Sequence, residues 1–551
     1  MTGRAGNDAA SGAAEVVRFL KDRGLRHIFG LPGSSLVSLL SELEKSDLQI
    51  VPAIHESVVV AAADGYSRVA GFGAAFLYML PGVANGLANL YNAWRDETPL
   101  LLLASQQAST RRTREGTIGE GDLVPLVEPF TRHARELTLG MPVRHNLAAA
   151  VRAAIGCPSG PSFVSLPQDV LETSVTIRGV PETHRVPAGA PDLGIVAERL
   201  AAAKHPLLIV GGQVRRYGGA KVLEDLVARH ALAVASEPGF NDRLAMAPAH
   251  ECWIGSATGP AGGFAEQRAD VVIVLGARFI AEGHPRAMPY FPAADFVAHV
   301  NADPAKLEET HVANWSTACD PSAFVAALDA TLEVPTEELL HARRAFIRSC
   351  RNVPVPDHPF ARGLAAYGHA LGALHDAMDR GWIVDEAVMG SVALINALKS
   401  GDGGRYVGST GASLGWGTGA AVGVALASGE PVTCVLGDGA LRFGVHGLWT
   451  AVEQRLPITF VILDNGGYGS TRYFARQYAE REGDGGSSAK PAYSGMDFRD
   501  VGSTSVGLLR GFGISCADPV EADDARPAIA AAWASAGDGP NAVVVRLPFG
   551  P

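Results

Sequence analysis

Cysteines, long apolar runs and an excess of basic residues are scarce or missing in this 551-residue sequence. The six cysteines are scattered without a CxxC pair, which argues against a disulfide framework or a zinc site and favours reduced thiols. No window approaches about 18 uninterrupted apolar residues, and the N-terminal segment lacks the apolar core of a signal peptide. The formal net charge of −11 argues against nucleic acid as the main partner. We therefore expect a cytoplasmic protein that binds neither membranes nor nucleic acid.

Short apolar runs alternate with helical stretches along the whole chain. Examples are PLLLLAS around Leu101, DVVIVLGA around Val272 and PITFVILDN around Val461. Such runs are typical of parallel strands that are covered on both faces. Proline-rich polar stretches at 176–192 and 334–362 interrupt this rhythm and indicate linkers. The sequence predicts an α/β protein with three doubly wound parallel-sheet domains, at 1–178, 190–335 and 360–551.

Two glycine-rich turns in the last domain carry polar residues directly after predicted buried strands. The first, in VTCVLGDGALRFG, holds Asp438 between Gly437 and Gly439, and the second, in VILDNGGYGS, holds Asn465. Residues 440–463 between them suffice for one crossover helix and the next strand, so both turns should lie at the same carboxyl edge, where open α/β sheets bind ligands. The two side chains and a backbone carbonyl of the second turn would supply the hard oxygen ligands that Mg²⁺ prefers. Bare backbone N–H groups there suit a phosphate.

The pair of turns resembles the signature of thiamine diphosphate (ThDP)-dependent enzymes of the pyruvate decarboxylase and acetolactate synthase type. That signature is GDG, some two dozen residues, then NN; here Asp464 replaces the first Asn and Asn465 keeps the second. The resemblance implies a pyrimidine-binding domain, a central Rossmann-like domain and a diphosphate-binding domain. It also implies ThDP and Mg²⁺ as cofactors. The metal ligands would be Asp438, Asn465 and Gly467, and the cofactor-binding residues would be Gly437, Asp438, Gly439, Ala440, Asn465, Gly467, Tyr468 and Gly469.

A glutamate far from these turns resembles the residue that activates the cofactor. In VPAIHESVVVAAADGYSRVAG, Glu56 opens a helix of small apolar residues, and the block is similar to the family's HE…ADGYAR segment. The resemblance implies that Glu56 holds the aminopyrimidine protonated at N1′, so that the thiazolium C2 proton is removed. Taken alone, Glu56 also fits an ordinary first-turn acid favoured by the helix dipole. Because the family takes this glutamate from a neighbouring subunit, a homodimer with interfacial active sites is implied, usually assembled as a homotetramer.

The segment VGSTGASLGWGTG, from Val407, is similar to the part of the family fold that holds the bent cofactor. The resemblance implies that Leu414 wedges between the two rings and that Ala412 offers its carbonyl to the pyrimidine. The competing interpretation is a tightly packed glycine-rich helix start. Upstream, VDEAVMG aligns with a diphosphate loop in which relatives carry hydroxyls, so these contacts must come from the backbone or from Ser391.

Several segments resemble benzoylformate decarboxylases in particular. Ser34 in LPGSS matches a serine that binds the substrate carboxylate there, although a serine at such a turn is also an ordinary helix N-cap. The two proton-shuttling histidines of those enzymes have no direct counterpart: Tyr78 stands at the first place, and Gly283 aligns with the second, with His284 one residue later. Tyr78 and His284 are therefore our candidate catalytic residues with Glu56 and Ser34. The candidate pocket walls, which core packing would also explain, are Thr117, Ile118, Tyr473 and Phe474.

The implied function is ThDP- and Mg²⁺-dependent decarboxylation of a small-molecule 2-oxo acid, with carboligation of the resulting enamine to an acceptor carbonyl as a second fate. The alternatives are an acetolactate-synthase-like or aldehyde-lyase-like carboligase, and a non-catalytic ThDP-binding paralogue. A nucleotide-linked oxidoreductase is a third, because VGGQVRRYGG at 210–219 resembles a nucleotide turn. That turn lacks a full GxGxxG with a following acid, so we favour a central domain without a nucleotide.

Overall fold

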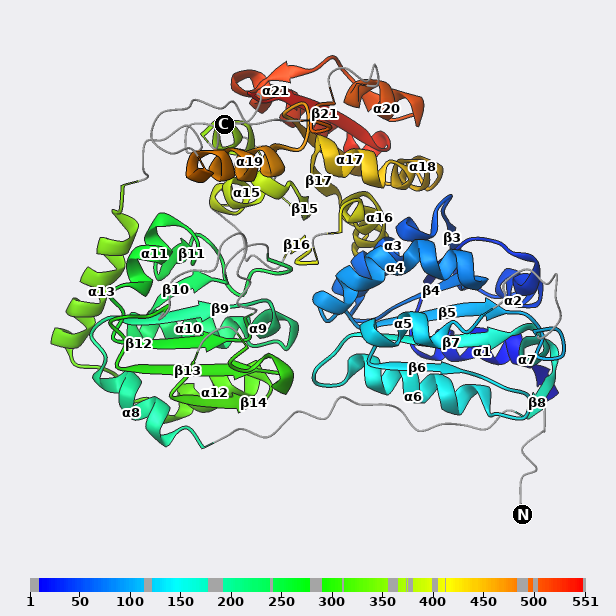
Figure 1. The fold of residues 1–551 in the computed structure, drawn as a ribbon, viewed down its shortest axis with the longest axis horizontal. Helices are drawn as coiled ribbons and strands as arrows, with labels where there is room; N and C mark the ends of the chain where they lie inside the picture. The colour runs from blue at the N-terminus through cyan, green and yellow to red at the C-terminus, as the bar shows by residue number, and fades with distance from the viewer. Residues whose placement is uncertain are drawn as a thin grey trace.

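The structure is a computed structural model. It describes residues 9–112, 121–176, 192–237, 241–277, 290–309, 312–354, 365–372, 374, 380–398, 405–411, 413–482, 494–498 and 504–548. Each of three lobes is built around its own parallel sheet with helices on both faces (Figure 1). The predicted fold class is therefore confirmed. Three of the four predicted domain boundaries (178, 190 and 360) lie outside the described residues.

The N-terminal lobe holds a six-stranded sheet of order β3-β2-β4-β5-β7-β6, in which every described pairing is parallel. Its strands are β2 (His27–Gly30), β3 (Gln49–Pro52), β4 (Gly73–Tyr78), β5 (Leu100–Gln106), β6 (His133–Glu136) and β7 (Pro161–Pro167). Its helices are α1 (Gly12–Asp22), α2 (Val37–Glu44), α3 (Glu56–Ala70), α4 (Met79–Arg95), α5 (Val124–Val127), α6 (Val143–Ile155) and α7 (Gln168–Glu172). A small antiparallel ribbon, β1 (Ala9–Ser11) with β8 (Ser174–Thr176), joins the two ends of this lobe.

The central lobe has a six-stranded parallel sheet of order β11-β10-β9-β12-β13-β14. Its strands are β9 (Pro206–Val210), β10 (Ala233–Ser236), β11 (Trp253–Ser256), β12 (Val271–Leu275), β13 (Phe296–Asn301) and β14 (Trp315–Ala318). The helices are α8 (Gly194–Ala202), α9 (Gln213–Arg216), α10 (Ala220–His230), α11 (Pro260–Glu266), α12 (Pro321–Thr331) and α13 (Glu337–Arg351).

The C-terminal lobe contains a seven-stranded sheet of order β16-β15-β17-β18-β21-β19, with β20 paired to β21. Its strands are β15 (Trp382–Glu386), β16 (Tyr406–Gly408), β17 (Val432–Gly437), β18 (Ile458–Asp464), β19 (Ser515–Cys516), β20 (Val520–Glu521) and β21 (Asn541–Arg546). The helices are α15 (Ser391–Ala397), α16 (Trp416–Ser428), α17 (Asp438–Gly444), α18 (His446–Glu453), α19 (Gly469–Glu482), α20 (Ser505–Gly511) and α21 (Ala525–Ala534). The apolar run of β17 is buried along its length, as expected for a central strand covered on both faces.

Helices α3 and α16 dock the N-terminal lobe onto the C-terminal lobe through direct backbone contact. A Cβ added at Gly423 of α16 would lie 1.9 Å from the carbonyl oxygen of Ala62, and one at Gly65 of α3 would lie 2.2 Å from that of Ala420. Only glycine permits such an approach at these positions. Helix α3 begins at Glu56, and α16 follows the loop that carries Leu414. This docking therefore fixes where Glu56 lies relative to Leu414 within one chain.

None of the helices in the described part of the chain has both the length and the apolar character that a membrane crossing requires.

Candidate active site

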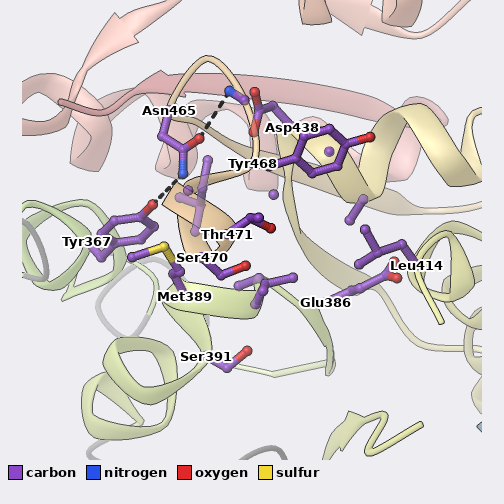
Figure 2. Close-up of a pocket in the computed structure, with 18 of the residues that line it drawn as sticks. Tyr367, Glu386, Met389, Ser391, Leu414, Asp438, Asn465, Tyr468, Ser470 and Thr471 are labelled. Carbon is purple, nitrogen blue, oxygen red and sulfur yellow. Dashed lines mark hydrogen bonds between the residues drawn. The ribbon is translucent and has the colours of Figure 1, made fainter. Parts of the chain in front are cut away.

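A cavity of about 520 Å³ opens at the carboxyl ends of β15, β17 and β18 in the C-terminal lobe. The crossover from β15 leads to β16 on one side, whereas β17 and β18 lie on the other side, so the cavity is at the topological switch point of this sheet. Figure 2 shows Asp438, Asn465, Tyr468 and Leu414 among the side chains around it.

Asp438 and Asn465 meet in this cavity from the two glycine-rich turns. Asp438 is 2% exposed, and among the described residues its Oδ2 atom has no hydrogen-bond partner. The Asn465 amide is oriented, because its Nδ2 donates to the Tyr367 hydroxyl (2.8 Å) and its Oδ1 accepts from the Gly467 N–H (3.3 Å). Burial, with the nearby charge of Asp464, raises the pKa of Asp438 to about 7, against the opposite effect of Arg442. A buried carboxylate oxygen without a donor is a strong acceptor for a cation.

The two glycines beside Asp438 leave the floor of the cavity bare. Gly437 has an ordinary φ of −71°, and Gly439 lies inside α17, so neither backbone conformation requires glycine. Among the described residues, a Cβ at Gly437 would come no closer than 4.0 Å to a neighbour (the Ala387 carbonyl oxygen). One at Gly439 would come no closer than 3.7 Å (the Phe498 ring). Packing does not require glycine there either, so the space belongs to the cavity that both residues line.

A second set of predicted residues gathers at the carboxyl edge of the N-terminal sheet. Ser34 follows β2, Glu56 follows β3 and Tyr78 ends β4, and these three strands are neighbours. The Ser34 and Tyr78 hydroxyl oxygens are 3.0 Å apart, and Asn85 Nδ2 donates to Glu56 Oε2 at 3.0 Å. Among the described residues, the C-terminal cavity is lined only from positions 367–474, so these N-terminal side chains are not part of its wall.

Three family models match consecutive parts of the chain. They are the thiamine pyrophosphate enzyme N-terminal TPP binding domain at residues 10–126, the central domain at 193–328, and the C-terminal TPP binding domain at 389–545. Each range falls on one of the three lobes, and together they cover most of the chain. The chain belongs to the ThDP enzyme family.

Similar proteins include both decarboxylases and acetolactate synthases. The benzoylformate decarboxylase of Pseudomonas aeruginosa is 26% identical over 473 residues, which are 83% of this chain and 86% of that protein. The acetolactate synthase isozyme 2 large subunit of Escherichia coli is 26% identical over 486 residues, 85% of this chain and 86% of that protein. The crystal structure of benzoylformate decarboxylase from Polynucleobacter necessarius has the same fold, with a TM-score of 0.83, 22% identity and 98% coverage of both chains. The protein is thus a ThDP-dependent enzyme of the decarboxylase/acetolactate synthase family, as predicted.

The cavity brings together most of the residues that the sequence predicts for cofactor binding in this ThDP enzyme. Those that line it are Leu414, Gly437, Asp438, Gly439, Ala440, Asn465, Gly467, Tyr468 and Gly469. The predicted pocket wall Phe474 also lines it, and Tyr473 packs beside that ring with centroids 5.5 Å apart. Ala412, Gly283, His284, Thr117 and Ile118 lie outside the described residues. The bare turn and Asp438 Oδ2, which has no hydrogen-bond partner in the described part of the chain, fit a diphosphate bound through a cation.

Asp464, which stands where the family signature has its first asparagine, accepts hydrogen bonds with both of its carboxylate oxygens. Its Oδ1 accepts from the Gly466 N–H (3.1 Å) and its Oδ2 from the Ser505 hydroxyl (2.7 Å). The side chain thereby shapes the second turn, and its charge acts on Asp438 from a distance. Ser391 donates to Asp385 Oδ1 at 2.9 Å, so its hydroxyl is already used in holding that carboxylate.

Sequence reasoning missed Glu386, which also lines the cavity. Its carboxylate accepts the N–H groups of Gly415 (2.7 Å), Trp416 (3.2 Å) and Gly417 (2.7 Å) and so caps the start of α16. Burial raises the pKa of Glu386 to about 7 despite these three donors. The available signal was its position at the carboxyl end of a buried strand, close to where Asp438 stands relative to β17. Ser470 and Thr471, whose side chains Figure 2 shows around the cavity, were missed as well.

The central domain keeps polar side chains at the switch point of its own sheet, where β9 and β12 end. Gln213 Nε2 donates to Glu97 (2.9 Å) and to Asn301 Oδ1 (3.0 Å). A Cβ at Gly212 would lie 1.9 Å from Asp242 Oδ1. The glycines of this turn therefore serve close packing of protein groups, unlike Gly437 and Gly439.

Proposed function

We propose that this ThDP enzyme decarboxylates a 2-oxo acid with ThDP and Mg²⁺. The observation that carries the proposal is the Ser34–Tyr78 hydroxyl pair, which stands at the same sheet edge as Glu56. Two neighbouring hydroxyl donors suit a substrate carboxylate, which accepts several hydrogen bonds. The similarity to benzoylformate decarboxylases over more than four fifths of the chain supports the same reaction class.

The C-terminal cavity would hold the cofactor through a cation. Asp438 Oδ2, Asn465 Oδ1 and the Gly467 carbonyl are the oxygen ligands that we assign to Mg²⁺, whose remaining positions suit phosphate and water. When bound, ThDP supplies a carbon nucleophile and an electron sink for the departing carboxylate. Leu414 and the backbone around it would orient the rings.

Glu56 would hold a proton at N1′ of the cofactor's aminopyrimidine ring. Asn85 donates to its Oε2, and Gly82 leaves room beside Oε1, where a Cβ would come within 3.2 Å. A larger residue at position 82 would push against this carboxyl group. Asn85 would thus hold the carboxylate in one orientation while leaving the other oxygen available.

A second copy of the chain would complete each site. Glu56, Ser34 and Tyr78 lie on the N-terminal lobe, whereas the described cavity wall comes from the C-terminal lobe. Large apolar side chains beside these regions are exposed, with Ile54 at 43% and Phe443 at 56%. A homodimer that brings the N-terminal edge of one copy to the cavity of the other would cover such surfaces. Assembly of two such dimers into a homotetramer is part of the same proposal.

The test is carbon dioxide release from a panel of aliphatic and aromatic 2-oxo acids, with ThDP and Mg²⁺, by wild type and by Glu56→Gln. Release from one class that is lost in the variant would support the proposal and define the substrate class. If wild type binds ThDP and releases carbon dioxide from none of them, the proposal is wrong.

Carboligation is the second candidate outcome, because acetolactate synthases match the chain with the same 26% identity as the decarboxylase. With a tyrosine in the place of a shuttling histidine, slow protonation would favour attack on an acceptor carbonyl. Product analysis in the presence of pyruvate and aldehyde acceptors separates the two fates, since aldehyde as the sole product with every acceptor excludes carboligation.

A further inference from the structure

One face of α4 carries a row of polar residues, of which the proposed function uses only the first, Asn85. Asn85, Asn89, Asn92 and Asp96 follow one another at spacings of four, three and four, which places them on one side of the helix and at its end. Asn89 and Asn92 are 0% exposed and Asp96 is 2% exposed. Buried groups of this kind are costly unless they are hydrogen-bonded, so their partners indicate what this face holds.

The connection between β16 and α16, which carries Leu414, is called the cofactor loop below. Asn92 binds the backbone of this loop with both ends of its amide. Its Nδ2 donates to the Ser413 carbonyl oxygen at 2.9 Å, and the Ser413 N–H donates to its Oδ1 at 3.1 Å. A Cβ at Gly411 would lie 2.0 Å from Asn92 Oδ1, so the loop backbone rests directly on the amide. The next residue after Ser413 is Leu414, which lines the cavity.

The neighbours of Asn92 on the same face bind the start of the loop on one side and the start of α3 on the other. Asp96 accepts from the Thr410 N–H and from the Ser409 hydroxyl, both at 2.9 Å, at the start of the same loop. Asn89 accepts from Asn92 Nδ2 (2.9 Å) and donates to the Ser57 carbonyl oxygen (2.9 Å). Ser57 is adjacent to Glu56, so a continuous chain of amide contacts joins the cofactor loop to the start of α3.

We propose that Asn92 is a positioning residue for the cofactor rings. Its amide fixes the Ser413 backbone and thereby the Leu414 side chain, and through Asn89 it ties the loop to the start of the helix that carries Glu56. The inference rests on the proposed function only in assigning the Leu414 loop to the rings and the Asp438 turn to the diphosphate. A change at Asn92 should therefore weaken binding of the ring portion and leave the diphosphate portion alone.

The experiment compares two probes on cofactor-free protein: ThDP and inorganic pyrophosphate, each with Mg²⁺, by isothermal titration. The variants are Asn92→Ala and the milder Asn92→Asp, which keeps an acceptor for the Ser413 N–H but loses the donor to Ser413 and Asn89. The matched control is Asn146→Asp in the same lobe. Asn146 is also buried (4% exposed) and also uses both amide ends, on Pro142 (2.9 Å) and Arg135 (3.1 Å).

We expect Asn92→Asp to weaken ThDP binding roughly tenfold or more, from the loss of hydrogen bonds that order the loop. Pyrophosphate binding should be unchanged, and Asn146→Asp should bind both probes as wild type does. Equal weakening of both probes by Asn92→Asp would show a merely structural role and overturn the inference. Wild-type affinity for both probes in Asn92→Asp would overturn it as well. Because binding is measured without turnover, selective loss of ThDP affinity supports the inference even if no 2-oxo acid is decarboxylated.

Discussion

Ser34 and Tyr78, 44 residues apart in the chain, meet through their hydroxyl oxygens at 3.0 Å. The contact is held by packing: a Cβ at Gly33 would lie 2.0 Å from the Tyr78 ring, so the ring rests on the backbone next to Ser34. The pair forms because β2 and β4 are neighbours in the sheet and both end at this edge. Tyr78, which stands where the resemblance implies a proton-shuttling histidine, is thus part of a hydroxyl pair.

Ser34→Ala and Tyr78→Phe should each lower kcat/KM for the 2-oxo acid by roughly tenfold, the effect of one lost hydrogen bond to a charged group. Because the two hydroxyls would share one carboxylate, the double variant should lose less than the product of the two single effects. Tyr78→Phe keeps the ring on Gly33, so its melting temperature should match wild type. Additive effects, or unchanged kinetics in either single variant, would contradict a shared carboxylate site.

Gly439→Ala should lower ThDP affinity without destabilising the protein. The added methyl group would project into the cavity, where overpacking typically costs about 1–3 kcal/mol, whereas alanine inside α17 gains up to about 1 kcal/mol of helix propensity. Thermal unfolding with and without ThDP measures both effects. The matched control is Gly423→Ala, whose methyl group would lie 1.9 Å from the Ala62 carbonyl oxygen and should destabilise the cofactor-free protein. If the Gly439→Ala protein binds ThDP as wild type does, the cavity does not need glycine at this position to make room for the diphosphate.

Two inactive variants should restore activity when they are combined in one dimer. Glu56→Gln removes the N-terminal carboxyl group and Asp438→Asn removes the cation ligand, so each homodimer should be inactive. If each site takes one group from each copy, the mixed dimer has one intact site. Co-expression with two different tags, followed by purification on both, isolates that mixed dimer for a decarboxylation assay. An inactive mixed dimer would indicate that Glu56 and Asp438 of the same chain serve one site.

The cofactor-free protein should lose stability as the pH rises toward neutrality. Burial raises the pKa of Asp438 and of Glu386 to about 7, from ordinary values of 3.8 and 4.5. Between about pH 4.5 and 7 the folded state therefore holds protons that the unfolded chain has released, so its stability falls as the pH rises through this window and levels off above it. Melting temperatures measured across the window should show this slope in wild type. The slope should be shallower in Asp438→Asn, and an identical slope in that variant would contradict the raised pKa of Asp438.

The parts of the site that follow buried strands were predictable because their determinants are local. The apolar runs before Asp438 and Asn465, and the spacing between them, suffice to place both at one sheet edge. The row of polar side chains on α4 was not predictable in the same way. Asn85, Asn89, Asn92 and Asp96 show the spacing of one helix face, but such a face in the sequence equally suits solvent. Only the tertiary contacts reveal that Asn92 and Asp96 are buried and hold a loop more than three hundred residues away.

The sequence by itself determined the three α/β domains, the glycine-bordered acid that follows β17 and the glutamate that opens α3. These features depend on strand composition, turn chemistry and helix starts, which act over a few residues. Only the tertiary structure decided that Ser34 meets Tyr78, that Glu386 caps α16 and that Asn92 holds Ser413. Those contacts depend on which strands become neighbours and on how closely Gly65 and Gly423 let two helices approach, and both are outcomes of packing across the whole chain.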